Sequence, residues 1–288
     1  MTDIFASFPL VGRLPSFGLP MRRAAQGVAI ATAVLLAGCG SSPKDTISLA
    51  NQKTPSSASS GMSAGTPGDA GSVSVKWSRT KPGCTGQCPT IDIDSVAFPG
   101  EPKLTELVDH VLAFMTGVDR QQNLPYDTVA GYVDYFWQTA QTRDATSLRG
   151  KVRASTGNLI VVELGTTQTL TGAAHGIPAT QFLNWDRARD RVVALDEALL
   201  PDRRAAFVEA LRTAHTRWKQ TLDAAKRDPA SFNRMWPFQE TDNFALTPDG
   251  MVLKYDAYVI APYAAGQPEL TIPYSALQGI LRPEWMPK

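Results

Sequence analysis

Two of the three cysteines lie close together in a loop whose composition restricts what their thiols can do. Cys84 and Cys88 are separated by three residues within the segment PGCTGQCP, residues 82–89. A redox pair usually has two intervening residues beside a helix, and a zinc site needs further ligands, which no nearby histidine supplies. The segment therefore favours a structural Cys84–Cys88 disulfide that closes a short loop and adds modest stability, with redox or metal chemistry as alternatives.

The familiar signatures of an active site are missing from the sequence. It contains no G-x-S-x-G elbow, no H-E-x-x-H, no phosphate-cradling loop and no dinucleotide glycine fingerprint. Carboxylates such as Glu163, Glu240, Asp242 and Asp256 are plentiful. Glycoside hydrolysis needs two carboxyl groups about 5 to 10 Å apart, and the sequence does not determine such a distance. We therefore expect each of these carboxylates to be solvated or ion-paired. We predict no catalytic residue, no cofactor and, with three His and three Cys, no metal site.

Two segments look less generic than the rest of the chain. His175 lies in the glycine-rich stretch 171–176, where small residues allow tight backbone bends and place the imidazole on an irregular loop. Tyr258 and Tyr263 lie in the segment 255–267 with Pro262 between them, and such rigid aromatic surface stacks on sugars or anchors a protein partner. We predict that these three residues bind a ligand; alternatively, the tyrosines cap a sheet and His175 bonds to a neighbouring loop.

The same segments carry a family resemblance. GAAHG at 172–176, LTPDG at 246–250, YDAYVIAPYAAG at 255–266 and TIPYSAL at 271–277 occur in this order. The set resembles the RsiV-type extracellular domain, a domain of unknown function that also accompanies some peptidoglycan deacetylases. In the anti-sigma factor that gives the family its name, this domain binds lysozyme outside the cell. The resemblance implies a lysozyme-like protein or peptidoglycan as the ligand.

The first forty residues predict where the protein resides. The uncharged apolar run 27–37 follows Arg22 and Arg23, and it is too short to span a bilayer, which takes about 20 residues. Leu-Ala-Gly-Cys at 36–39 resembles the bacterial lipoprotein signal, which implies cleavage before Cys39 and lipidation of its thiol; an uncleaved anchor is the alternative. Residues 1–20 fit a signal poorly, so we predict translation from Met21. Gly40, by resemblance to sorting signals, favours the outer membrane, facing the periplasm.

Composition divides the remaining chain. After the signal peptide at 1–38, the lipidated cysteine and a flexible tether occupy 39–72, because a Gly/Ser/Pro/Ala/Thr-rich segment buries too little apolar surface to fold. We place an N-terminal α+β subdomain at 73–170 and an RsiV-like C-terminal subdomain at 171–288. The tether holds these folded parts clear of the bilayer.

Periodicity predicts an α+β fold with an antiparallel or mixed sheet and packed helices. Alternation predicts strands near 73–77 and 91–98, a hairpin of 148–155 with 158–164, further strands at 182–185 and 192–195, and a hairpin turning at 247–250. Helical spacing predicts helices over 104–115 and 132–140, one opened by Pro201 that runs to Leu222, and a short terminal helix. On these helices we expect His110 to be solvated and His215 to be packed and hydrogen-bonded.

Charge and composition restrict the function further. The 28 Lys and Arg residues nearly balance 27 Asp and Glu, which removes the electrostatic basis for nucleic-acid binding. The sequence therefore favours a non-catalytic envelope lipoprotein, held to the membrane by its lipid, that binds a protein or glycan ligand. The alternatives are a cell-wall glycan-modifying enzyme and a structural or assembly role in the envelope.

Overall fold

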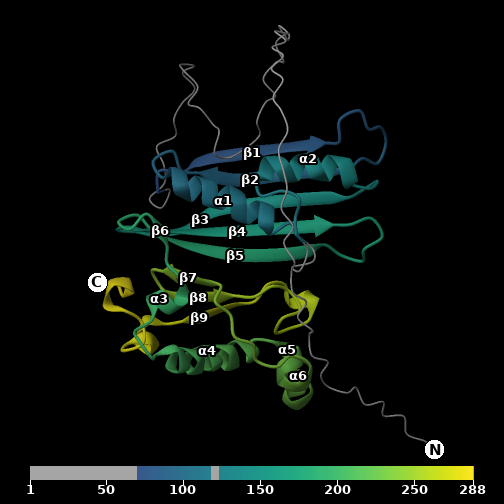
Figure 1. Ribbon diagram of the computed structural model, residues 1–288. Coiled ribbons are helices and arrows are strands. Elements are labelled where there is room, and N and C mark those ends of the chain that lie inside the picture. Colours follow the sequence, from purple (N-terminus) through teal and green to yellow (C-terminus); the bar gives the residue numbers. More distant parts are fainter. Residues whose placement is uncertain (1–69, 118–122, 288) are drawn as a thin grey trace, which may run out of the picture. The chain divides into compact units, whose positions relative to one another are not determined.

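A six-stranded sheet forms the larger half of the fold. The computed structural model describes residues 70–117 and 123–287, which all belong to the unit 45–288. The sheet has the order β1-β2-β3-β4-β5-β6 (Figure 1). Its strands are β1 (Val73–Thr80), β2 (Thr90–Ala97), β3 (Ala145–Thr156), β4 (Leu159–Thr169), β5 (Ile177–Asp186) and β6 (Arg191–Val192). Neighbours pair antiparallel except β2 and β3, which are parallel.

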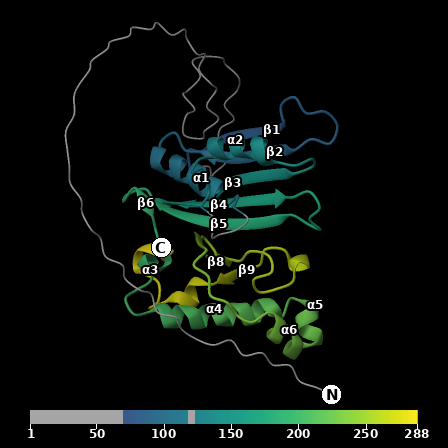
Figure 2. The same cartoon turned by 45° about the vertical axis from the view of Figure 1, so that its right-hand side comes forward.

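Two helices supply that parallel crossover and cover one face of the sheet (Figures 1 and 2). α1 (Pro102–Phe114) starts at a proline, which suits the first turn because its missing N–H is not needed there. Leu104, Val108 and Leu112 recur every four residues and are fully buried against the sheet. α2 (Val129–Thr139) begins at Thr128, whose side chain accepts a hydrogen bond from the Gly131 N–H. Both predicted helices are confirmed.

The β3–β4 hairpin turns at Gly157, which has a φ of 58°. Ile160, Val161 and Val162 are all fully buried, although adjacent residues of a strand face opposite sides of a sheet. The helices cover one side, and a second sheet covers the other. This explains the uninterrupted apolar run in the sequence.

The second sheet is antiparallel, with the order β7-β8-β9. Its strands are β7 (Phe244–Thr247), β8 (Gly250–Lys254) and β9 (Glu269–Ile272), and α4 (Arg204–Lys219) packs on β9. Shorter helices complete this half: α3 (Leu195–Ala198), α5 (Asp223–Arg227), α6 (Pro229–Met235), η2 (Tyr263–Ala265), η3 (Tyr274–Leu277) and η4 (Pro283–Trp285). The mixed α+β fold class is thereby confirmed. Among the described residues, no helix is long and apolar enough to cross a bilayer.

Three boundaries differ from the expectation. α4 begins at Arg204 rather than Pro201, because Asp202 adopts a φ of 59° that no helix allows. The helix ends at Lys219, before Leu222, and the strand expected to run to Leu195 ends at Val192. Residue 170, where the predicted subdomains divide, lies between β4 and β5, which pair along ten residues of one sheet.

Two asparagines bond each sheet to the backbone of the other. From β5, the buried Asn184 Nδ2 donates to the Phe244 carbonyl at 2.7 Å and its Oδ1 accepts from the Leu246 N–H at 2.9 Å. Just before β7, Asn243 Oδ1 accepts from the Phe182 N–H at 2.7 Å, and its Nδ2 donates to the Thr180 carbonyl at 3.1 Å. These bonds satisfy backbone groups that the strand ladders leave unpaired.

Candidate functional site

Four aromatic side chains from three separate segments meet on the surface; we call His175, Trp236, Tyr258 and Tyr263 the aromatic cluster. The rings of His175 and Tyr263 stack with centroids 3.9 Å apart. Tyr258 lies 5.8 Å from His175 and 5.5 Å from Tyr263, and Trp236 stacks on its other side at 6.2 Å. The three residues that the sequence singled out are thus in mutual contact, although 83 positions separate His175 from Tyr258.

Buried neighbours fix the segment that carries the two tyrosines. Ile260 and Ala261 are 0% and 1% exposed, so the chain between the rings is anchored in the core. Pro262 then precedes η2, at whose start Tyr263 donates its hydroxyl to the Gly176 carbonyl at 3.1 Å. Asp256 accepts from the Thr180 N–H of β5 at 2.9 Å. The cluster therefore rests on a rigid support rather than on a free loop.

Tyr258 combines a half-exposed ring with a strained backbone conformation. Its side chain is 52% exposed, and its φ of 69° is one that bulky L-residues rarely adopt. Such strain costs about 1 kcal/mol or more and tends to persist at functional sites. The backbone therefore holds an apolar ring toward solvent at the expense of stability.

His175 contacts its own loop through Nδ1 and the tyrosine segment through Nε2. Nδ1 lies 2.9 Å from the Gly176 carbonyl, which can only accept, so Nδ1 carries a proton. In the neutral ring, Nε2 then accepts from the Tyr258 hydroxyl in a long contact of 3.4 Å. The imidazole acts here as a link between the β4–β5 loop and the tyrosine segment.

A charged network lies on the face of the large sheet that packs against the second sheet, at the edge of their contact. Glu163 on β4 is contacted by Lys254 at 2.6 Å, Arg153 at 3.1 Å and Lys151 at 3.3 Å. Glu269 forms ion pairs with Arg153 at 2.8 Å and with Lys254 at 2.9 Å. Burial alone would raise the pKa of Glu163, but the hydrogen bond and charge of Lys254, aided by Lys151, outweigh it and hold that pKa below its usual value.

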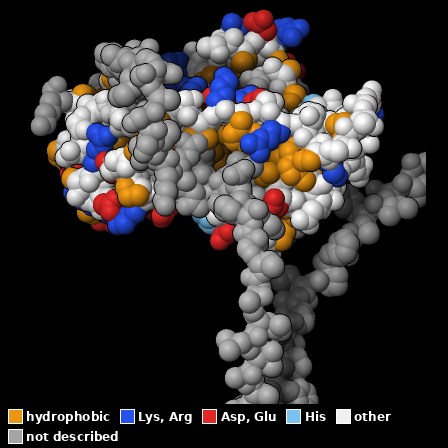
Figure 3. Space-filling model, turned by 90° about the horizontal axis from the view of Figure 1, so that it is seen from above, with side chains coloured by type: hydrophobic (Ala, Val, Ile, Leu, Met, Phe, Trp, Pro, Cys, Tyr) orange, Lys and Arg blue, Asp and Glu red, His pale blue; other side chains and the backbone are white. Residues whose placement is uncertain are grey.

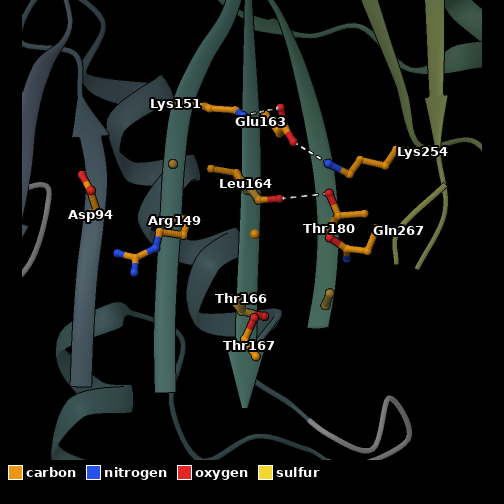
Figure 4. A pocket seen from close by; sticks show the side chains of 13 residues that line it. Asp94, Arg149, Lys151, Glu163, Leu164, Thr166, Thr167, Thr180, Lys254 and Gln267 are labelled. Carbon is orange, nitrogen blue, oxygen red and sulfur yellow. Dashed lines mark hydrogen bonds and ion pairs between the residues drawn. The ribbon is translucent and has the colours of Figure 1, made fainter. Parts of the chain in front are cut away.

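Beside this network the sheet is hollowed (Figure 4). The hollow, which we call the Gly165 hollow, has a volume of about 400 Å³, and Arg149, Lys151, Gly165, Thr180, Lys254 and Gln267 are among its lining residues. Figure 4 shows Glu163 between Lys151 and Lys254, with Arg149 on the neighbouring strand. Thr167 also lines the hollow, and a Cβ on Gly176 would come within 2.8 Å of its methyl group, so the hollow adjoins the His175 loop.

The remaining sequence candidates lie apart from these features or outside the described residues. Cys39, predicted to be lipidated, falls outside them. Cys84 and Cys88 form the expected disulfide in the β1–β2 loop. His110 is exposed, and its Nδ1 meets the Asp127 carbonyl at 2.9 Å. The predicted Met21 start lies in the segment that the structure does not describe.

His215 is packed as expected, but its bonding differs. It is 2% exposed and lies against Trp218 and Phe238. Within the described part of the chain its buried Nε2 has no hydrogen-bond partner, which corrects the expectation for that nitrogen. Burial, reinforced by the charges of Lys219 and Arg212, lowers the pKa of His215 to about 4, so the ring is neutral at physiological pH.

Sequence reasoning missed Trp236 and the Gly165 hollow. Trp236 follows α6 with no motif around it, and only the fold brings it to Tyr258. Gly165 itself was a signal in the sequence, because a glycine inside a strand often marks a close approach by a ligand or another backbone.

On the face that Figure 3 shows, Lys and Arg side chains are interspersed with hydrophobic and acidic ones rather than gathered in one basic patch.

Comparisons with known proteins identify the family. The model "Protein of unknown function (DUF3298)" matches residues 197–275, which include Trp236, Tyr258 and Tyr263 but not His175. A DUF3298 family member from Bacteroides fragilis NCTC 9343 is 21% identical with a TM-score of 0.53, covers 75% of this chain and 95% of its own, and shows the fold alone.

No curated protein matches the sequence. The crystal structure of a DUF3298 family protein from Pseudomonas aeruginosa PAO1 is 38% identical to this chain, with a TM-score of 0.69. The match covers 75% of this chain and 96% of that one. At this identity and coverage, the chain belongs to the DUF3298 family.

Proposed function

We propose that this protein is an envelope lipoprotein whose RsiV-like domain binds a glycan or protein ligand without turning it over. The observation that carries the proposal is the aromatic cluster, in which His175, Tyr258 and Tyr263 come together on a rigid support with a strained, half-exposed ring at its centre. Stacked and tilted aromatic rings at a surface favour contact with sugar rings or with an anchor residue of a partner. Peptidoglycan and lysozyme-like proteins are the ligands that the family resemblance implies.

The charges near the cluster favour binding over glycan cleavage. An enzyme that cleaves a glycosidic bond needs one carboxyl group whose pKa is raised so that it can donate a proton. Glu163 and Asp94 both line the Gly165 hollow. The pKa of Glu163 is lowered as described above, and the hydrogen bond from Lys76 lowers that of Asp94. Both carboxylates are therefore ionised at neutral pH, and neither is suited to act as that acid.

Replacing Tyr258 or Tyr263 by alanine tests the binding face. With purified full-length protein in detergent, we expect Tyr258→Ala to weaken binding of muramyl glycan fragments or of lysozyme by about 2 kcal/mol, the usual cost of losing an anchor residue. Its unfolding midpoint should change little, because the ring is half exposed and alanine keeps the Cβ that is strained at this φ. His175→Ala and Tyr263→Ala should also weaken binding.

Tyr263→Phe serves as the matched control, since it keeps the ring and removes only the hydroxyl bond to Gly176. It should bind nearly as well as the native protein. Affinity that is unchanged in all three alanine variants, with lowered unfolding midpoints, would show that the cluster is purely structural.

Lipid anchoring is tested independently at Cys39. In cells fed a labelled fatty acid, Cys39→Ser should abolish labelling and leave the unprocessed precursor, because the thiol is the group that is acylated. Cys84→Ser, which affects a cysteine engaged in the disulfide, is the control and should keep the label. Equal labelling of the Cys39→Ser protein would refute the anchor.

A further inference from the structure

Gly165 interrupts a row of side chains that crosses four strands of the large sheet. The register aligns Asp94 on β2 with Arg149 on β3, Arg149 with Gly165 on β4, and Gly165 with Thr180 on β5. Three of these residues project side chains, whereas Gly165 projects none. All four line the hollow, so the missing side chain contributes directly to its space.

No neighbour requires a glycine at this position. A Cβ on Gly150 would collide with Ser95, and one on Gly250 would lie 2.6 Å from the Ile272 carbonyl oxygen, so close packing explains both of those glycines. A Cβ on Gly165 would meet nothing closer than the Ala179 carbonyl oxygen at 3.7 Å, which is an ordinary contact. Glycine in a strand interior is destabilising relative to residues with side chains. The chain thus keeps an unfavourable residue where a larger one fits, and the effect is an open hollow.

The lining of the hollow carries more positive than negative groups. Arg149, Lys151 and Lys254 face Asp94 and Glu163, and the charge of Glu163 is already shared among three cations. Lys151 is 62% exposed and meets Glu163 only at 3.3 Å, so it can turn toward a ligand. Arg149 is 50% exposed and is paired with Asp92 on its outer side.

Gln267 adds an unused donor. Its Nε2 is buried and has no hydrogen-bond partner among the described residues. Leaving a buried amide unsatisfied is unfavourable, and natural structures rarely do so without another group to bind. Together with the cations, this amide provides donors for an acceptor with more than one oxygen.

We propose that the Gly165 hollow binds the carboxylate group of a small polar ligand. The Arg149 guanidinium and the Lys151 ammonium match a carboxylate through charge-assisted hydrogen bonds, while Lys254 stays paired with Glu163 and Glu269. A volume of about 400 Å³ lies in the range of small-molecule sites. The proposal does not depend on the aromatic cluster, because none of the four cluster residues lines the hollow.

A pair of related sugars tests the proposal with purified full-length protein. N-acetylmuramic acid is N-acetylglucosamine with an added lactyl carboxylate, so the two probes differ by the group in question. Calorimetric titration should show the acid binding at least about tenfold more tightly than the neutral sugar, as expected for hydrogen bonds to a charged group. Gly165→Val places a side chain between Arg149 and Thr180, narrows the hollow and should reduce this preference, while the unfolding midpoint stays constant or rises because valine favours strands.

Further variants separate the possible outcomes. Lys151→Gln should reduce the preference for the acid severalfold, whereas Lys103→Gln, a similarly exposed lysine outside the hollow, should not. Tyr258→Ala should leave the preference unchanged, which separates this site from the aromatic cluster. Equal affinity for both sugars, or full retention of the preference in Gly165→Val, would overturn the proposal. Equally tight binding of inorganic phosphate would overturn the assignment to carboxylate.

Discussion

Glu163→Gln is expected to lower the free energy of unfolding by about 2 kcal/mol. The carboxylate is only 9% exposed and neutralises Lys254, itself 11% exposed, as well as Arg153. Removing one partner of a buried ion pair leaves an uncompensated charge, which costs about 3 to 5 kcal/mol when burial is complete. Glu269 still pairs with Lys254 and Arg153, and Lys151 is mostly solvated, so we expect a smaller loss. Urea unfolding at pH 7 measures it.

The stability difference between the native protein and Glu163→Gln should depend on pH. Because the pKa of Glu163 is lowered in the folded protein, its contribution is complete above the usual value of 4.5 and is lost as the pH falls through the folded pKa. The unfolding curves of native and variant protein should therefore converge below about pH 4.5. His215 also resists protonation when folded, so stability starts to fall below about pH 6.5, but equally in both proteins.

A surface ion pair provides the control for Glu163. Glu197 contacts Arg191 at 2.6 Å, but both side chains are more than 40% exposed. Glu197→Gln should therefore change the stability by less than about 1 kcal/mol. A constant difference between the native and Glu163→Gln proteins from pH 7 to pH 3 would contradict the role assigned to the carboxylate.

Asn184→Leu is expected to cost about 3 kcal/mol of stability. The substitution keeps the size of the side chain but removes the partners of the Phe244 carbonyl and the Leu246 N–H, both of which belong to buried residues. Each unsatisfied backbone group costs about 1 to 3 kcal/mol. Denaturant unfolding gives the total, and hydrogen exchange at the Leu246 amide identifies the cause, since that amide should lose protection.

Asn233 is the matched control, because it is exposed and its side chain, among the described residues, bonds to Lys219 at 2.6 Å. Asn233→Leu should leave the unfolding midpoint almost unchanged. If Asn184→Leu kept both its stability and the protection of Leu246, the asparagines would not be what joins the two sheets.

Local signals in the sequence account for most of the individual elements. The helical spacing of Leu104, Val108 and Met115 predicted α1, and Gly157 predicted the hairpin of β3 and β4. These signals act within one turn or one strand pair, so they can be recognised without knowing the tertiary structure. The disulfide followed similarly from the short loop between its cysteines.

Features that depend on distant contacts were harder to predict. The predicted division after residue 170 lies just before β5, and β5 pairs with β4 in the same sheet. Sequence singled out His175, Tyr258 and Tyr263 by residue type, whereas their contact and the addition of Trp236 depend on the packing of three segments. The space over Gly165 depends on the register across four strands, which no local pattern sets.

The parallel pairing of β2 with β3 has a consequence for the order of folding. The β1–β2 hairpin and the antiparallel series β3-β4-β5 each join strands that are neighbours in sequence. Residues 98–144 separate β2 from β3, so these two pieces meet only after that long segment has closed into a loop, at a cost in chain entropy. Non-local pairings of this kind slow folding. We therefore expect the core between the sheet and α1 and α2 to form late, when the crossover docks.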